Sequence, residues 1–151
     1  MLLDLCKRNF KNQKNEVKKA MLHTKNSQNE ICKCEFPWAN DKDYFGCKDS
    51  PSEFFNLPND RQLHLVNWIQ NKLTPIKTFT VSKTSYGLKH IYSDYSEAKE
   101  GRQFYVTNAQ FKGAMLLAGF KVKDTSEQNW EFNISKRSFI RSPQGGMTIK
   151  N

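Results

Sequence analysis

Hydrophobic and polar positions along the chain follow helical spacing in several stretches. Over residues 2–25 the apolar side chains recur every three, four or seven positions, which predicts a basic amphipathic helix. The stretch "NDRQLHLVNWIQNKL" (59–73) has a capping residue at Asn59 or Asp60, an apolar face and a proline, Pro75, just beyond its end. This pattern predicts a second helix, whose apolar face consists of Leu63, Val66, Ile69 and Leu73.

Two further helices are predicted on either side of a turn at "EAKEGRQ" (97–103). In "TSYGLKHIYSDY" (84–95) the apolar residues share one helical face, and Ser82 or Thr84 can cap it. The next helix begins with the capping box Thr107-x-x-Gln110. It ends at a glycine with a left-handed conformation and an apolar contact after it, Gly119 and Phe120.

Short alternating segments predict strands beside these helices. "IKTFTV" (76–81) alternates like a strand, and "QFYV" (103–106) resembles a strand end. "FKV" (120–122) and "WEFNI" (130–134) alternate on either side of a polar connection, which predicts a β-hairpin. The residues that follow, "RSPQGGMTIKN", predict a flexible C-terminal tail. The fold class is therefore predicted to be α+β.

Residues 26–59 form a long segment without periodicity, rich in Asn, Asp, Ser, Pro and Gly with scattered aromatic residues. A structureless connection of this length is uncommon inside a compact domain, so something must hold it in place. A metal ion is one candidate. The other is packing of its aromatic side chains, which are Phe36, Trp38, Tyr44, Phe45, Phe54 and Phe55.

The order helix, short strand, helix, helix, hairpin over residues 58–136 resembles a winged helix-turn-helix domain. The phrases "SYGLKH" and "FYVTNAQFKGAMLLAGF" are also similar to segments of small proteins from Gram-positive phages and mobile genetic elements. Three regions follow: a basic helix with an irregular Cys/aromatic insert (1–57), a winged-helix-like domain (58–136) and the tail (137–151). The resemblance implies that the third helix of the domain enters the major groove, and that residues 121–129 form the wing.

Composition and charge bear on the partner. The formal net charge is +9, the isoelectric point is about 9.4, and 13% of the residues are aromatic. Such a positive charge favours nucleic acid, an acidic protein or an anionic membrane as partner, although solubility alone also explains it. Neither a membrane-spanning stretch nor a signal peptide is apparent in the sequence, so we expect a cytoplasmic protein in a bacterial host cell.

Basic side chains gather in three places. A ridge on the predicted N-terminal helix either tracks phosphates or is a solvated face beside a core stripe. Two more lysines lie on the predicted wing, and further basic residues follow the hairpin. The residues are Lys7, Lys11, Lys14 and Lys18 on the ridge, Lys121 and Lys123 on the wing, and Lys136 and Arg137 after it.

The helix over 108–118 is predicted to bury Phe111, Ala114, Met115 and Ala118. Its outer face then carries Ala109, Gln110, Lys112, Gly113, Leu116 and Leu117. Base readout needs several Arg, Lys, Asn or Gln residues, and only Asn108, Gln110 and Lys112 qualify here. A glycine inside a helix costs about 1 kcal/mol relative to alanine, so Gly113 indicates the close approach of another backbone. That backbone belongs to the N-terminal helix, the irregular segment or a partner.

Other candidate chemistry is sparse. Cys32, Cys34 and Cys47 with His23 could hold a structural zinc ion, although the single-residue gap between two of the cysteines departs from the usual spacing; otherwise they are buried or free thiols. Tyr86 and His90 lie one helical turn apart and form either a stacking or partner-contact site or an ordinary surface pair. No catalytic motif or phosphate-binding glycine loop is present, so we expect no enzyme and no other cofactor.

Two functions are predicted. The first is a non-enzymatic nucleic-acid-binding accessory in replication or regulation, acting mainly through phosphate contacts. The alternative is a phage-encoded inhibitor of a host protein such as a nuclease or a CRISPR effector. In that case the apolar patch of Ala109, Gly113, Leu116 and Leu117 would anchor the partner. A homodimer through the same patch, or through the apolar stripe of the predicted N-terminal helix, is compatible with both.

Overall fold

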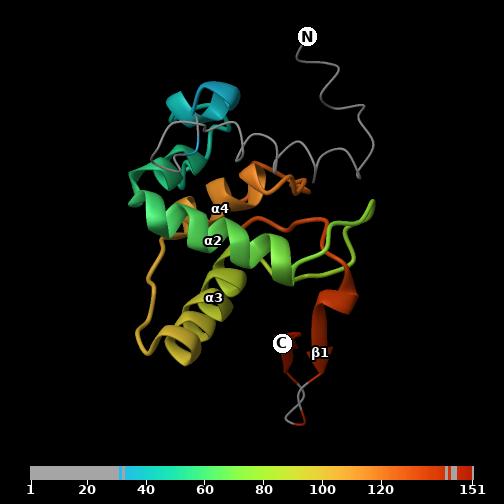
Figure 1. Cartoon of the computed structure of the whole chain (residues 1–151). Helices are drawn as coiled ribbons and strands as arrows, with labels where there is room; N and C mark the ends of the chain where they lie inside the picture. The colour runs from blue at the N-terminus through green and yellow to red at the C-terminus, as the bar shows by residue number, and fades with distance from the viewer. Residues whose placement is uncertain (1–30, 32, 142, 144–145, 151) are drawn as a thin grey trace.

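The structure of the protein is a computed structural model, and the residues described are 31, 33–141, 143 and 146–150. The α-helices within these residues are α2 (Asn59–Lys72), α3 (Ser85–Glu100) and α4 (Asn108–Leu117). Short 3-10 helices are η2 (Lys33–Glu35), η3 (Pro37–Asn40), η4 (Pro51–Asn56) and η5 (Lys136–Ser138), and the strands are β1 (Phe139–Arg141) and β2 (Met147–Ile149). Mixed helix and strand agree with an α+β fold, and α4 contacts both α2 and α3 (Figure 1).

The ends of α4 follow from local chemistry. Thr107 Oγ1 accepts a hydrogen bond from the Gln110 amide at 3.1 Å, and Gln110 Oε1 accepts one from the Thr107 amide at 2.9 Å. At the other end Gly119 has a φ of 89°, and the Phe120 amide donates back to the Met115 carbonyl at 3.1 Å. Both the predicted capping box and the predicted Schellman stop are confirmed.

The other two helices depart from prediction in detail. Helix α2 buries Leu65 and Trp68, whereas Leu63, which was predicted on the buried face, is only half-buried. Helix α3 continues to Glu100, so the turn predicted over 97–103 is wrong. The helix ends at Gly101, whose φ of 68° is the left-handed conformation of a C-terminal glycine.

Strand pairing in the middle of the chain is limited to single bridges. Residues 76–81, predicted as a strand, form none, and residues 103–106 are also irregular. The predicted pairing of 120–122 with 130–134 is present as one antiparallel bridge, Val122 with Phe132. Asn133 replaces further ladder bonds: its side chain accepts from the Lys121 amide and donates to the Ile76 carbonyl, both at 2.6 Å.

The irregular segment is held by aromatic packing. The Trp38 ring packs on Phe36 and Phe55, with ring centroids 5.6 and 5.7 Å apart, and Phe54 is fully buried. Helix η4 lies directly against α4, and Gly113 is at the contact. Of the candidates for the backbone that approaches Gly113, the irregular segment is therefore the correct one.

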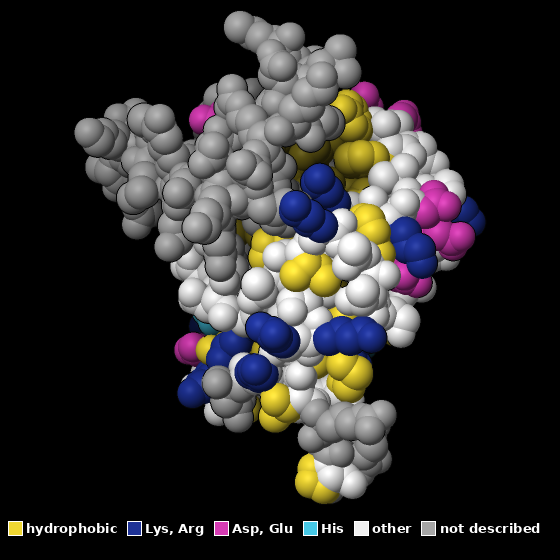
Figure 2. Space-filling view, turned by 90° about the vertical axis from the view of Figure 1, so that its right-hand side faces the viewer, with side chains coloured by type: hydrophobic (Ala, Val, Ile, Leu, Met, Phe, Trp, Pro, Cys, Tyr) yellow, Lys and Arg dark blue, Asp and Glu magenta, His cyan; other side chains and the backbone are white. Residues whose placement is uncertain are grey.

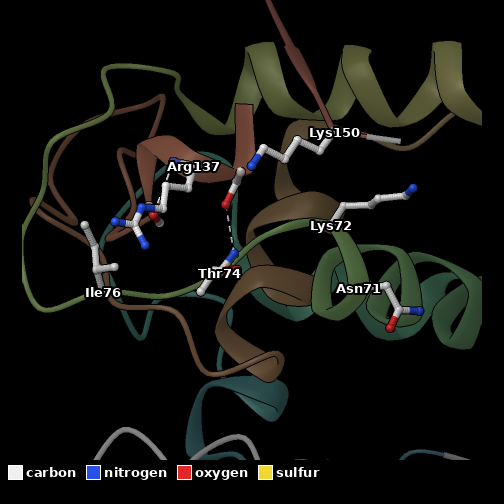
Figure 3. Close-up of a pocket in the computed structure, with 8 residues that line it drawn as sticks. Asn71, Lys72, Thr74, Ile76, Arg137 and Lys150 are labelled. Atoms are coloured by element: carbon white, nitrogen blue, oxygen red, sulfur yellow. Dashed lines mark hydrogen bonds between the residues drawn. The ribbon is translucent and has the colours of Figure 1, made fainter. Parts of the chain in front are cut away.

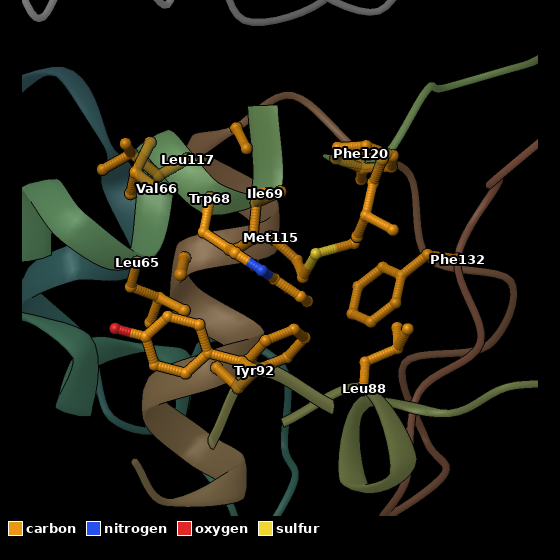
Figure 4. Packing of buried hydrophobic residues seen from close by; sticks show 14 of the residues in the cluster. Leu65, Val66, Trp68, Ile69, Leu88, Tyr92, Met115, Leu117, Phe120 and Phe132 are labelled. Carbon is orange, nitrogen blue, oxygen red and sulfur yellow. The ribbon is translucent and has the colours of Figure 1, made fainter. Parts of the chain in front are cut away.

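One hydrophobic core joins all of these elements. Side chains of α2, α3, α4 and the 130–134 segment interdigitate in it, as Leu65, Leu88, Met115 and Phe132 do in Figure 4. Trp38 and Phe54 from the irregular segment and Phe139 and Ile149 from the C-terminal region belong to the same cluster. This cluster contains residues from both sides of each predicted boundary, 57/58 and 136/137.

The C-terminal region is also more structured than predicted. Strands β1 and β2 pair antiparallel, with Phe139 opposite Ile149 and Arg141 opposite Met147. The prediction of a flexible tail is therefore wrong for these residues. Polar and glycine-rich composition between the strands concealed the short apolar alternation on either side of it.

We predict that Gly113→Ala destabilises the protein, because its Cβ would lie 2.5 Å from Phe54 Cβ and clash with the Pro51 carbonyl oxygen. Overpacking of this kind costs roughly 1–3 kcal/mol in free energy of unfolding, which urea denaturation measures. Gly87→Ala in α3 is the matched control, since a Cβ there meets nothing within 4 Å, and it should be neutral or stabilising. Equal effects of both changes would contradict the α4–η4 contact.

Candidate functional site

Helix α4, predicted to read DNA, is enclosed on almost every side. Lys112 is fully buried, and Ala109, Gly113 and Leu117 are buried as well, while Leu116 is half-buried against the core. The predictions of Lys112 as a base or phosphate contact and of an exposed apolar patch are therefore wrong. The physical reason is that η4 covers the face that a helical wheel assigns to solvent.

The other two predicted readers on this helix have internal roles. The Asn108 side-chain amide donates to Asp49 Oδ2 at 2.8 Å and to the Gln128 carbonyl and Asn129 Oδ1, both at 3.1 Å. Gln110 is engaged in the capping box. Asn108 thus ties α4 to neighbouring segments, and Gln110 closes the N-terminus of the helix itself, so both side chains already have partners within the protein.

Lys112 is surrounded by an aromatic ring, a backbone carbonyl and a thiol. Its ammonium lies 4.5 Å from the centre of the Trp130 ring and 3.5 Å from the Asp49 carbonyl oxygen. The Cys47 thiol donates to the same oxygen at 3.4 Å. Burial lowers the pKa of Lys112, and the neighbouring Cys47 and Asp49 partly oppose this.

The predicted wing carries both signs of charge. Lys121 and Lys123 are exposed, but Lys123 forms an ion pair of 3.0 Å with Glu131. Asp124 and Glu127 line the same shallow hollow as that pair. Hydrogen bonds from Ser126 lower the pKa of Asp124, which keeps this carboxylate ionised. A surface with this balance is poorly suited to phosphate.

A second hollow has the opposite character. It has a volume of about 570 Å³ and lies between the end of α2, the segment after it, η5 and the residue after β2 (Figure 3). Its lining contains three cationic side chains, three hydroxyl side chains and no carboxylate. We call it the basic hollow, and its residues are Asn71, Lys72, Thr74, Ile76, Ser135, Arg137, Ser138 and Lys150.

Backbone hydrogen bonds hold the walls of the basic hollow together. The Thr74 amide donates to Ser138 Oγ at 3.0 Å, and the Ser135 amide donates to the Thr74 carbonyl at 2.8 Å. The Lys150 amide donates to the Ser138 carbonyl at 3.1 Å. Three segments far apart in sequence therefore converge, and the side chains of Arg137 and Lys150 remain exposed at the rim.

The surroundings of the basic hollow are also rich in cations. Figure 2 shows Lys and Arg side chains spread over the middle of one face, whereas Asp and Glu gather at its edges. Lys77 and Lys136 are exposed, and Lys83 is half-buried with its ammonium 6.0 Å from the Phe139 ring centre. The basic hollow is thus part of a broader positive region.

The predicted pair Tyr86 and His90 lies at the start of α3 as expected. Their rings meet edge to face with centroids 4.7 Å apart, and Tyr86 is 52% exposed. The structure adds two residues to this pair. The Lys89 ammonium lies 4.9 Å from the Tyr86 ring centre and 5.2 Å from that of Tyr105, which is 70% exposed.

His64 belongs to a separate polar cluster between α2 and α3. Its Nδ1 and the Tyr92 hydroxyl are 2.8 Å apart, and its Nε2 lies 3.7 Å from Glu100 Oε1. Burial raises the pKa of Tyr92, so the phenol keeps its proton at neutral pH. The Arg61 guanidinium lies 3.4 Å from the Phe104 ring centre. This cluster braces the two helices against the segment that follows them.

Several predicted site residues lie outside the described residues, or have side chains that do: Lys7, Lys11, Lys14, Lys18, His23, Cys32 and Cys34. The ridge and the zinc site therefore stay predictions. Among the described residues, no group of three His, Cys, Asp or Glu residues could hold a metal ion. None of the helices described is both long and apolar enough to cross a membrane.

Of the residues in the basic hollow, the sequence singled out Arg137, together with its neighbour Lys136 outside the hollow, and missed the rest. Lys72 occupies the last turn of a predicted helix, where its only local signal is a favourable position near the helix dipole. Lys150 was assigned to the tail. Only the long-range hydrogen bonds that join Thr74, Ser135 and Ser138 bring these residues together, and no local pattern encodes them.

Comparison of the chain with models of known protein families, with curated proteins and with solved structures finds no match. The resemblance to a winged-helix domain thus stays a prediction. The helices occur in the predicted order, but the described residues include no strand between α2 and α3, and α4 faces η4.

The buried lysine makes stability depend on pH in a predictable direction. Because the pKa of Lys112 is below 10.5 in the folded protein, the unfolded chain binds more protons between these two pKa values. Its contribution to stability therefore improves as pH rises toward 10.5, by at most about 1.4 kcal/mol per pH unit. Urea denaturation of the wild type and of Lys112→Met at several pH values measures this. A difference between them that does not change with pH would contradict the burial of this charge.

Proposed function

We propose that the protein binds nucleic acid without catalysis, and that the basic hollow and the positive region around it contact the phosphates. The observation that carries the proposal is the lining of the hollow: Arg137 and Lys150 stand among hydroxyl side chains with no carboxylate. Lys72 also lines the hollow, and its ammonium lies 5.3 Å from the Tyr95 ring centre. Phosphate oxygens accept hydrogen bonds from each of these groups.

The fixed walls of the hollow favour this assignment. Backbone bonds position Thr74, Ser135 and Ser138, so a bound phosphate would not have to order the frame. The long side chains at the rim are free to follow the strand. Phosphate contacts of this type fix register and supply affinity, but they do not read sequence.

Recognition of bases through α4 is not part of the proposal. Asn108, Gln110 and Lys112 are engaged inside the protein, and η4 would have to leave before a groove could accept this helix. The predicted wing contributes less to phosphate binding, because Lys123 is already paired with Glu131. Binding is therefore expected to depend strongly on salt and weakly on sequence.

The predicted inhibitor of a host protein loses its anchor, because Ala109, Gly113 and Leu117 are buried. We accordingly retain the accessory role in replication or regulation. Its setting, a phage or mobile element in the cytoplasm of a bacterial host, is inferred from the short sequence resemblance.

Removing two rim cations should weaken binding and reduce its salt dependence. For Arg137→Gln combined with Lys150→Gln, we expect the slope of log K against log salt to fall by about 1 to 2 units. Fluorescence anisotropy with labelled DNA at several salt concentrations measures the slope. Both side chains are exposed, so the fold should persist.

Lys123→Gln is the matched control, because this lysine is also exposed but already paired with Glu131 at 3.0 Å. Its salt slope should stay close to that of the wild type. A double variant that keeps the wild-type slope, or a wild type that binds neither DNA nor RNA at low salt, would refute the proposed function.

A further inference from the structure

A surface at the start of α3 exposes aromatic rings, which contacts with phosphate do not require. It consists of Tyr86, Lys89, His90 and Tyr105, and we call it the tyrosine platform. Tyr86 and Tyr105 are 52% and 70% exposed, the highest values among the large hydrophobic side chains of the described residues. Exposure of single tyrosines is ordinary, but here two of them flank one lysine.

The platform is fixed by the backbone beneath it. In the segment before α4, Phe104 and Val106 point into the core, and Tyr105 between them points outward. The Phe104 amide donates to Ser96 Oγ at 2.8 Å, and Ser93 Oγ donates to the Phe104 carbonyl at 3.3 Å. These bonds hold Tyr105 against α3, beside the side chain of Lys89.

The environment of Lys89 also indicates a ligand. Only 6% of the residue is exposed, and its ammonium lies within 5.2 Å of both tyrosine ring centres. Within the described part of the chain this ammonium has no hydrogen bond and no ion pair. A nearly buried cation without an anionic partner is suited to accept one from a ligand.

We propose that the tyrosine platform binds single-stranded nucleic acid, with unpaired bases stacked on Tyr86 and Tyr105 and a phosphate next to Lys89. This inference rests on the proposed function and names its substrate class. Base faces stack on tyrosine rings regardless of sequence, and a lysine between the rings matches the phosphate that links two nucleotides. Bases in a duplex are stacked on each other and cannot reach the rings.

The test compares a labelled single-stranded oligonucleotide with a duplex of the same length, using the full chain and fluorescence anisotropy. Tyr86→Ala combined with Tyr105→Ala should weaken single-strand binding by about tenfold or more, and leave duplex binding unchanged. The corresponding phenylalanine variant should bind the single strand like the wild type, because it keeps both rings. Lys89→Met should also weaken single-strand binding.

Tyr44→Ala is the matched control, since Tyr44 is 48% exposed and packs on Phe45, whereas the rings next to the Lys89 ammonium are those of Tyr86 and Tyr105. It should change neither affinity. If the alanine variant binds the single strand as tightly as the wild type, the platform does not bind bases, and a protein partner becomes the better occupant. That result differs from failure of the proposed function, in which the wild type binds neither oligonucleotide.

Discussion

The close contact between α4 and η4 at Gly113 determines how the rest of the structure is arranged. Any side chain at this position would meet the Pro51 carbonyl and Phe54 Cβ, so only glycine lets the two backbones approach this closely. The contact encloses Lys112, buries Phe54 and secures the irregular segment on the core. It also removes the helix from the surface. A helix that supplies core packing on nearly every side cannot also read a groove.

The two proposed binding surfaces lie where the core ends. The basic hollow forms at the far end of α2, where the C-terminal hairpin returns to the segment after that helix (Figures 1 and 3). The tyrosine platform forms where the chain passes from α3 to α4. Both depend on serine and threonine bonds that fix an extended segment: Ser138 with Thr74 in the first case, and Ser96 with Phe104 in the second. Small hydroxyl residues thus position the larger charged and aromatic ones.

Local features of the fold could be predicted from the sequence, because their causes are local. The capping box at Thr107, the stop at Gly119 and the order of the helices follow from residues close together in the chain. The burial of Lys112 could not be predicted, since a helical wheel cannot show that η4 covers its outer face. The strand predicted over 76–81 is absent: Ile76 bonds to the backbone and side chain of Asn133, and the residues that follow it form no ladder. The proximity of Lys72, Arg137 and Lys150 could not be predicted either, because it depends on contacts between segments far apart in the sequence.

The most direct test of this account is an NMR titration of the isotope-labelled protein with a single-stranded oligonucleotide, followed through the backbone amide shifts. If nucleic acid binds at the basic hollow and the tyrosine platform while the α4–η4 contact stays closed, the amide shifts of both surfaces should change. These are the shifts of Thr74, Ser135 to Ser138 and Lys150, and of Tyr86 and Tyr105. Amides within α4 and η4 should not change. Large changes along Ala109 to Leu117, together with loss of the Phe54 contacts, would show that η4 opens and that α4 is the binding element, which would contradict the account.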